Sequence, residues 1–191
     1  YPERREVAKK IVGIFNAEKV DIILGLGDLY EGNYQGLQDY LDDKILYEEP
    51  WLGANAPVYW TLGNHDNWGV RDYQYIANCS FMEARNYTVD LPGGWRLVIY
   101  ANCDGHYFSS NPTDLIWLSN ILDRAREEKK KIIIAAHVRI DQDYPGNPPS
   151  FTTANTYSAF SFNAAAQRGI IEKAKDDGAD IRYVFHGHVH R

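Results

Sequence analysis

Residues 58–66 read VYWTLGNHD, a short apolar run followed by residues that can turn the chain and carry chemistry. The β-branched and aromatic side chains over residues 57–62 predict a buried strand. Gly63 lets the backbone turn sharply where this strand ends, and Asn64, His65 and Asp66 follow at once. The sequence therefore places three polar side chains at the carboxyl end of a predicted strand.

Three other predicted strands run into polar residues in the same way. Residues 20–26 lead to Gly27 and Asp28, residues 132–136 lead to His137, and residues 181–185 lead to the segment HGHVH at 186–190. Ligands in open α/β sheets gather beyond the carboxyl ends of strands, so these clusters can converge on one place. Because His, Asp and Asn side chains are good ligands for Zn, Mn or Fe, the pattern predicts a metal site.

Strands alternate with helices along the rest of the chain, which favours an α/β fold. No repeat or linker divides the sequence, so we expect one domain over residues 1–191. Val7, Ile11, Ile14 and Phe15 form an apolar stripe at helical spacing. Further elements are predicted as follows: helices at 37–45, 112–125 (capped by Asn111) and 160–177, and a hairpin of residues 87–91 and 95–102 that turns at PGG. The strand that leads to His137 is predicted to begin at Lys131.

Composition disfavours several classes of function. The net charge of −6 lacks the basic excess of a nucleic-acid-binding protein and disfavours attraction to anionic membranes. No run of 18 apolar residues occurs, so no membrane span is expected. Residues 1–10 are charged and polar, unlike a signal peptide, and we expect the natural protein to begin upstream of them.

Two cysteines and two glycosylation-type triplets bear on the compartment. Cys79 and Cys103 can form one disulfide or stay as two thiols, and we predict that they are joined. The triplets begin at Asn78 and Asn86 and favour a secreted glycoprotein. The alternative is a cytoplasmic protein with reduced thiols.

The four clusters together resemble the calcineurin-like metallophosphoesterases. The matching segments are Gly27-Asp28, GNHD at 63–66, His137 and GHVH at 187–190, in the order that the family has them. Within the family, the strand spacing and the GHVH segment are most similar to the purple acid phosphatase branch. This resemblance implies two packed mixed β-sheets flanked by helices, with the site at one edge of the sandwich.

The resemblance also implies a role for each residue. Asp28 would bridge two divalent or trivalent metal ions (Fe, Mn or Zn), and His190 would bind the first metal. The second metal would take Asn64, His137 and His188. His65 would protonate the leaving group as a general acid, oriented by Asp66, while a metal-bridging hydroxide attacks a small-molecule phosphomonoester or phosphodiester.

Two departures from the family pattern affect these expectations. The family opens with an Asp-x-His motif, and none precedes Asp28 here, so we expect a chain incomplete at its N-terminus and also at its C-terminus, with an incomplete first metal site. The purple branch places its iron-binding tyrosine three residues after the bridging aspartate, where this chain has Glu31, while Tyr30 lies two residues after. An iron–tyrosinate centre is therefore not expected.

Two other functions stay open beside the phosphoesterase. A non-catalytic extracellular binding or structural module of the same fold is favoured by the missing motif and disfavoured by the retention of His65 and the other ligands. A nuclease is disfavoured by the acidic charge. The sequence leaves open the substrate, the native metals and the oligomeric state.

Overall fold

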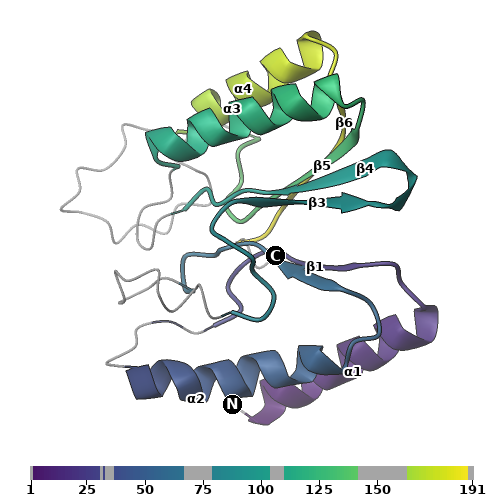
Figure 1. Cartoon of the computed structure of the whole chain (residues 1–191). Coiled ribbons are helices and arrows are strands. Elements are labelled where there is room, and N and C mark those ends of the chain that lie inside the picture. The colour runs from purple at the N-terminus through teal and green to yellow at the C-terminus, as the bar shows by residue number, and fades with distance from the viewer. Residues whose placement is uncertain are drawn as a thin grey trace, which may run out of the picture.

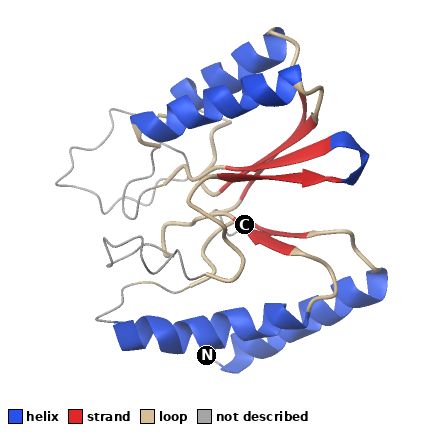
Figure 2. Cartoon of the chain, in the orientation of Figure 1, coloured by secondary structure: helices blue, strands red, loops and turns tan. Residues whose placement is uncertain are grey.

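Two β-sheets pack face to face between two pairs of helices (Figures 1 and 2). The structure, a computed structural model, describes residues 2–30, 32, 37–66, 79–103, 110–141 and 163–188. The helices are α1 (Pro2–Glu18), α2 (Leu37–Glu48), α3 (Pro112–Glu127) and α4 (Ala164–Asp176). Helices α1 and α2 cover one sheet, and α3 and α4 cover the other. The predicted α/β sandwich with flanking helices is confirmed.

The smaller sheet pairs β1 (Ile23–Gly25) with β2 (Val58–Trp60) in parallel. The larger sheet has the order β3-β4-β5-β6 and is mixed. Its strands are β3 (Tyr87–Leu91), β4 (Trp95–Ile99), β5 (Lys131–Ala136) and β6 (Asp180–His186), of which β3 and β4 are antiparallel and the other pairs are parallel. Strands β3 and β4 form the predicted hairpin, and Gly93 and Gly94 supply its positive-φ turn (φ 75° and 78°).

Three apolar layers hold the sandwich together. Leu97 and Ile99 of the larger sheet pack against Leu24 and Tyr59 of the smaller one. A second layer joins the outer face of the larger sheet to α3 and α4, and a third lies between the smaller sheet, α2 and the 3-10 helix η1 (Glu49–Gly53). Because the two sheets share a core, the carboxyl ends of β1 and β2 face those of β5 and β6.

The prediction of the buried face of α1 was partly wrong. Val7 and Ile14 are 54% and 59% exposed, whereas Val12 is buried and Ala8 is partly buried. Several overlapping apolar stripes fit the sequence of this helix, and the sheet selects among them only when it packs. Among the residues that the structure describes, no helix has the length and apolarity needed to cross a bilayer.

Candidate metal centre

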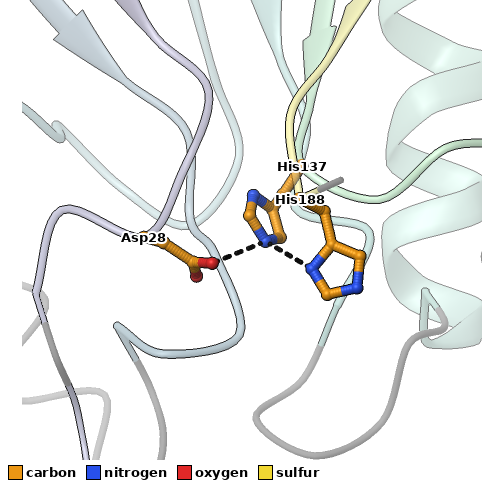
Figure 3. A group of neighbouring side chains, drawn as sticks. All are labelled: Asp28, His137 and His188. Carbon is orange, nitrogen blue, oxygen red and sulfur yellow. Dashed lines mark hydrogen bonds and ion pairs between the residues drawn. The ribbon is translucent and has the colours of Figure 1, made fainter. Parts of the chain in front are cut away.

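The candidate site lies where β1, β2, β5 and β6 end. His137 directly follows β5, and Asn64 lies four residues after β2. Asp28 and His188 follow β1 and β6 and adopt positive φ values of 55° and 66°. Both side chains point toward His137 (Figure 3).

The four predicted ligands of the second metal meet at one atom, Nε2 of His137. This atom lies 3.2 Å from Asp28 Oδ2, 3.1 Å from Asn64 Oδ1 and 3.1 Å from His188 Nδ1. The polar atoms of Asp28, His137 and His188 all lie within 4.8 Å of one another. The expected convergence of these side chains is therefore present, while their role as ligands stays a prediction.

The imidazole of His137 is held from its other side by the smaller sheet. Its Nδ1 donates a hydrogen bond to the Leu26 carbonyl at 2.6 Å, since a carbonyl can only accept. The His137 carbonyl in turn accepts from the N–H of Gly187 at 2.9 Å. A Cβ on Gly187 would lie 2.4 Å from the Leu26 oxygen, so only glycine fits this junction of the two sheets.

The electrostatics of the site centre on the Asp28–His137 pair. Burial opposes the charged form of His137, but the Asp28 carboxylate outweighs burial, and the pKa of His137 lies above its usual value. The pKa of Asp28 is lowered in the same way, because contacts with His137 and the His65 N–H outweigh its burial. Carboxylate and amide oxygens around Nε2 thus stabilise a positive charge at this point.

A metal ion fits this arrangement of donors. Ligand bonds of about 2.0–2.2 Å place neighbouring donor atoms roughly 3–3.5 Å apart around a four- or six-coordinate ion. The contacts of His137 Nε2, at 3.1 to 3.2 Å, match that spacing. The bond from Nδ1 to Leu26 leaves Nε2 as the coordinating nitrogen, as is usual for histidine ligands.

Asp66 joins the two loops that carry Asp28 and Asn64. Its carboxylate, 5% exposed, accepts hydrogen bonds from the N–H groups of Asp28 at 3.0 Å, Tyr30 at 2.9 Å and Gly63 at 2.7 Å. Burial and the nearby Asp28 charge raise the pKa of Asp66 to about 6 despite these donors. Asp66 thus holds Asp28 in place, and the predicted orientation of His65 by Asp66 stays a prediction.

Sequence reasoning missed Asn102, which fixes the loop that begins with His137. The Oδ1 atom of this fully buried side chain accepts from the N–H of His137 at 3.1 Å and of Val138 at 2.8 Å. Asn102 is the last residue of the predicted hairpin strand 95–102 and follows the observed strand β4, which ends at Ile99. The rule that selected the other residues, a polar side chain where a strand ends, also applied to Asn102.

The structure describes some of the remaining predicted residues and not others. The partly buried His65 lies at the site, and its N–H donates to Asp28 Oδ1 at 2.9 Å. His190 and Glu31 lie outside the described residues. The Tyr30 hydroxyl donates to the buried Glu48 carboxylate of α2, so this side chain serves the core.

The predicted disulfide is wrong, because Cys79 and Cys103 are two separate, buried thiols. Cys79 packs in the cluster with Tyr30 and Met82, whereas Cys103 packs against Val138 and donates to the Leu62 carbonyl at 3.4 Å. The two thiols thus belong to different apolar clusters.

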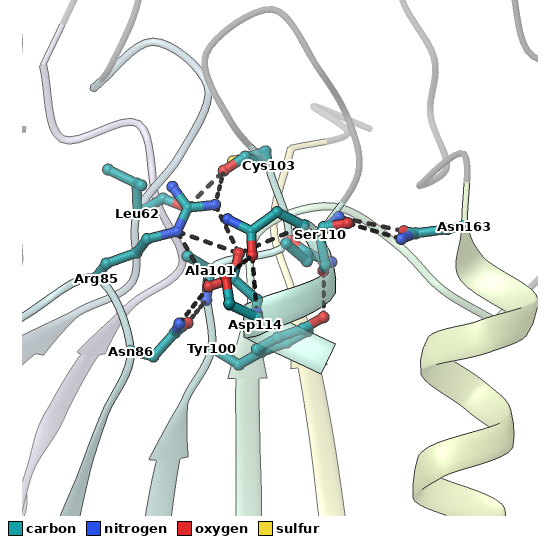
Figure 4. A network of polar contacts seen from close by, with 12 residues as sticks. Leu62, Arg85, Asn86, Tyr100, Ala101, Cys103, Ser110, Asp114 and Asn163 are labelled. Atoms are coloured by element: carbon teal, nitrogen blue, oxygen red, sulfur yellow. Dashed lines mark hydrogen bonds and ion pairs between the residues drawn. The ribbon is translucent and has the colours of Figure 1, made fainter. Parts of the chain in front are cut away.

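The glycosylation triplet at Asn86 is also engaged within the fold. The Asn86 amide donates to Asp114 at 2.6 Å and accepts from the Ala101 N–H at 2.8 Å (Figure 4). A glycan on this nitrogen would replace one of its two hydrogens and leave one to donate. The triplet at Asn78 lies outside the described residues, and secretion stays a prediction.

Comparisons with known proteins bear on the fold and the family of this chain. A dimetal phosphatase from Danio rerio has a similar fold, with a TM-score of 0.69 and 10% sequence identity over 97% of this chain and 78% of that one. At this identity the likeness concerns the fold alone. A comparison with curated protein sequences gave no match. The sequence profile of the calcineurin-like phosphoesterases matches residues 1–191, and the chain belongs to that family.

Proposed function

We propose that this protein hydrolyses small phosphomonoesters or phosphodiesters, with Asp28, Asn64, His137 and His188 holding one metal ion and Asp28 and His190 contributing to a second. Membership of the calcineurin-like phosphoesterases supports metal-dependent phosphoester hydrolysis in general. The observation that carries the proposal is the meeting of Asp28, Asn64 and His188 at His137 Nε2, within 3.2 Å. When bound, two such cations supply charge that clamps phosphate oxygens and lowers the pKa of water.

The residues of the chain supply orientation and proton transfer. Asp66 fixes the backbone of Asp28 by accepting from its N–H, and the N–H of His65 donates to Asp28 Oδ1, which keeps the carboxylate directed at the site. His65 lies next to Asn64, so its ring can reach the departing oxygen of an ester held at the centre. By donating a proton to that oxygen, His65 would contribute roughly 10²–10⁴ in rate.

Two histidine variants separate proton transfer from metal binding. His65→Ala should lower the turnover of p-nitrophenyl phosphate and bis-p-nitrophenyl phosphate by about 10²–10⁴ while leaving metal content nearly unchanged. His137→Ala should lose metal and activity together, because its Nε2 is the atom on which the other donors converge. Metal stoichiometry is measured on the same samples.

Two outcomes would contradict the proposal. Equal activity of His65→Ala and the parent protein would exclude His65 as the general acid. A parent protein that binds two metals and hydrolyses neither substrate would favour a non-catalytic module of the same fold.

A further inference from the structure

A cavity of about 210 Å³ lies beside the candidate metal centre, between α1 and η1. Asp28 lines it, so the cavity adjoins the residue predicted to bridge the metals. Tyr47, Trp51 and Trp60 supply aromatic walls. Its volume is below the ~300–1,000 Å³ typical of pockets that enclose drug-sized ligands, so one ring system fits it better than a long chain.

The aromatic walls are arranged around the cavity and are not fully used in packing. The rings of Trp51 and Trp60 meet edge to face with their centroids 5.2 Å apart. Trp60 is 8% exposed and forms part of the core, whereas Trp51 and Tyr47 keep partly exposed surface. Aromatic surfaces of this kind bind planar rings by stacking and edge contacts.

Two arginines of α1 line the cavity of this acidic protein, and one of them is paired with Glu49. Arg4 and Arg5 both line it, whereas the chain as a whole carries a charge of −6. The Arg5 Nε donates to Glu49 at 2.8 Å, which fixes the guanidinium and uses one of its five N–H groups. Guanidinium groups bind phosphate oxygens and also stack on rings.

We infer that this cavity holds the alcohol half of the substrate, and that the preferred substrates are phosphate esters whose alcohol ends in a planar aromatic ring, such as an aryl alcohol or a nucleoside. The inference rests on the proposed function, because the phosphate of such an ester would lie at Asp28 while its ring enters the cavity. The arginines would attract the anionic ester. An alkyl phosphate would leave the aromatic walls without a partner.

Fluorine NMR of protein labelled with 5-fluorotryptophan tests this without requiring turnover. The zinc-loaded protein is titrated with phenylphosphonate and, as the matched ligand without a ring, methylphosphonate. Phenylphosphonate should shift the Trp51 and Trp60 resonances and bind about tenfold more tightly than methylphosphonate. Trp95 and Trp117, which pack at the larger sheet, serve as internal references.

Two variants test whether the preference for phenylphosphonate arises in the cavity. Trp51→Ala should bring the two phosphonates to nearly equal affinity. Ala8→Phe, which fills the cavity from α1 and keeps every aromatic wall, should do the same if Trp51→Ala does not fold. Trp95→Ala should leave the preference unchanged. If adenosine monophosphate shifts the same resonances, the alcohol half of the substrate is assigned as a nucleoside. If only phenylphosphonate shifts them, it is assigned as an aryl alcohol.

The inference is overturned if neither ring-bearing ligand moves the Trp51 and Trp60 resonances of zinc-loaded protein, or if both cavity variants keep the full preference. Those results would leave the hydrolysis of p-nitrophenyl phosphate untouched. Loss of hydrolysis in metal-loaded protein would instead contradict the proposed function, whatever the resonances show.

Discussion

At the scale of single residues, the site depends on backbone conformations that residues other than glycine rarely adopt. Asp28 and His188 have φ values of 55° and 66°, in the left-handed region. Such conformations cost roughly 1–3 kcal/mol each and persist where the surroundings enforce them. For Asp28 the enforcement comes from Asp66, which accepts its N–H at 3.0 Å.

Gly63 is the residue whose side chain, if it had one, would disturb Asp28 most directly. A Cβ there would lie 2.2 Å from both the nitrogen and Oδ1 of Asp28. Gly63→Ala should therefore weaken zinc binding by about 10–100-fold, the effect expected when the support of a ligand is lost. Competition with a chromophoric chelator measures the affinity. Gly53→Ala, where nothing lies within 4 Å of the added carbon, should bind zinc like the parent. Equal affinity in both variants would show that the loop adapts without cost.

At the scale of helices and strands, two glycines in and after α4 show that the same substitution can raise or lower the free energy of unfolding, depending on its position. Gly169 lies inside the helix with open space around its Cα, and Gly178 follows the helix with a φ of 98°. Gly169→Ala should raise the free energy of unfolding by about 0.5–1 kcal/mol. Gly178→Ala should lower it by about 1 kcal/mol, because alanine is strained in the left-handed region. Urea unfolding measures the free energy of unfolding of both variants. If both substitutions changed it in the same direction, the assigned end of α4 would be contradicted.

The β3–β4 hairpin contains an ion pair that titrates in acid. Hydrogen bonds from Arg96 at 2.7 Å and Lys130 at 3.0 Å lower the pKa of Asp90 to about 2. A carboxyl group with a lowered pKa stabilises the fold above its unfolded pKa of about 3.9, and this contribution disappears as pH falls toward 2. Half of the Asp90 side chain is exposed, so screening limits the effect to about 1 kcal/mol at most. The destabilisation caused by Asp90→Asn should be present at pH 6 and vanish near pH 2. A difference independent of pH would exclude the ion pair as its source.

Local sequence signals predicted the elements well and the contacts between them poorly. The hairpin and α3 follow from a PGG turn and from Asn111, whose side chain caps the helix as expected. The buried face of α1 and the disulfide depend on how distant segments pack; the first prediction was partly wrong and the second was wrong. The convergence of Asp28, Asn64, His137 and His188 was predictable because each follows a strand. The backbone bonds of Asp66 were not, because they join loops 38 residues apart.

At the scale of the whole molecule, a buried polar network links the helical layer to the loops near the site (Figure 4). Asp114, in the first turn of α3 and 4% exposed, accepts from Arg85 at 2.9 Å and Asn86 at 2.6 Å. Arg85 also donates to the Cys103 carbonyl at 3.2 Å. The Cys103 thiol bonds to Leu62, next to the GNHD loop. The network thus connects α3, the start of β3 and the end of β2.

Removing Asp114 should therefore destabilise the whole fold and not only its helix. Asp114→Ala leaves the largely buried Arg85 without its carboxylate, a change that typically costs about 3–5 kcal/mol. Asp123→Ala is the control on the same helix, since its contact with Arg126 is 3.4 Å long and half exposed, and it should cost less than about 1 kcal/mol. The two are compared by urea unfolding followed by tryptophan fluorescence and by circular dichroism. Coincident transitions at lower urea for Asp114→Ala would show that the sheets and helices unfold together. If Asp114→Ala destabilised the protein no more than Asp123→Ala, the network would have no part in joining the layers.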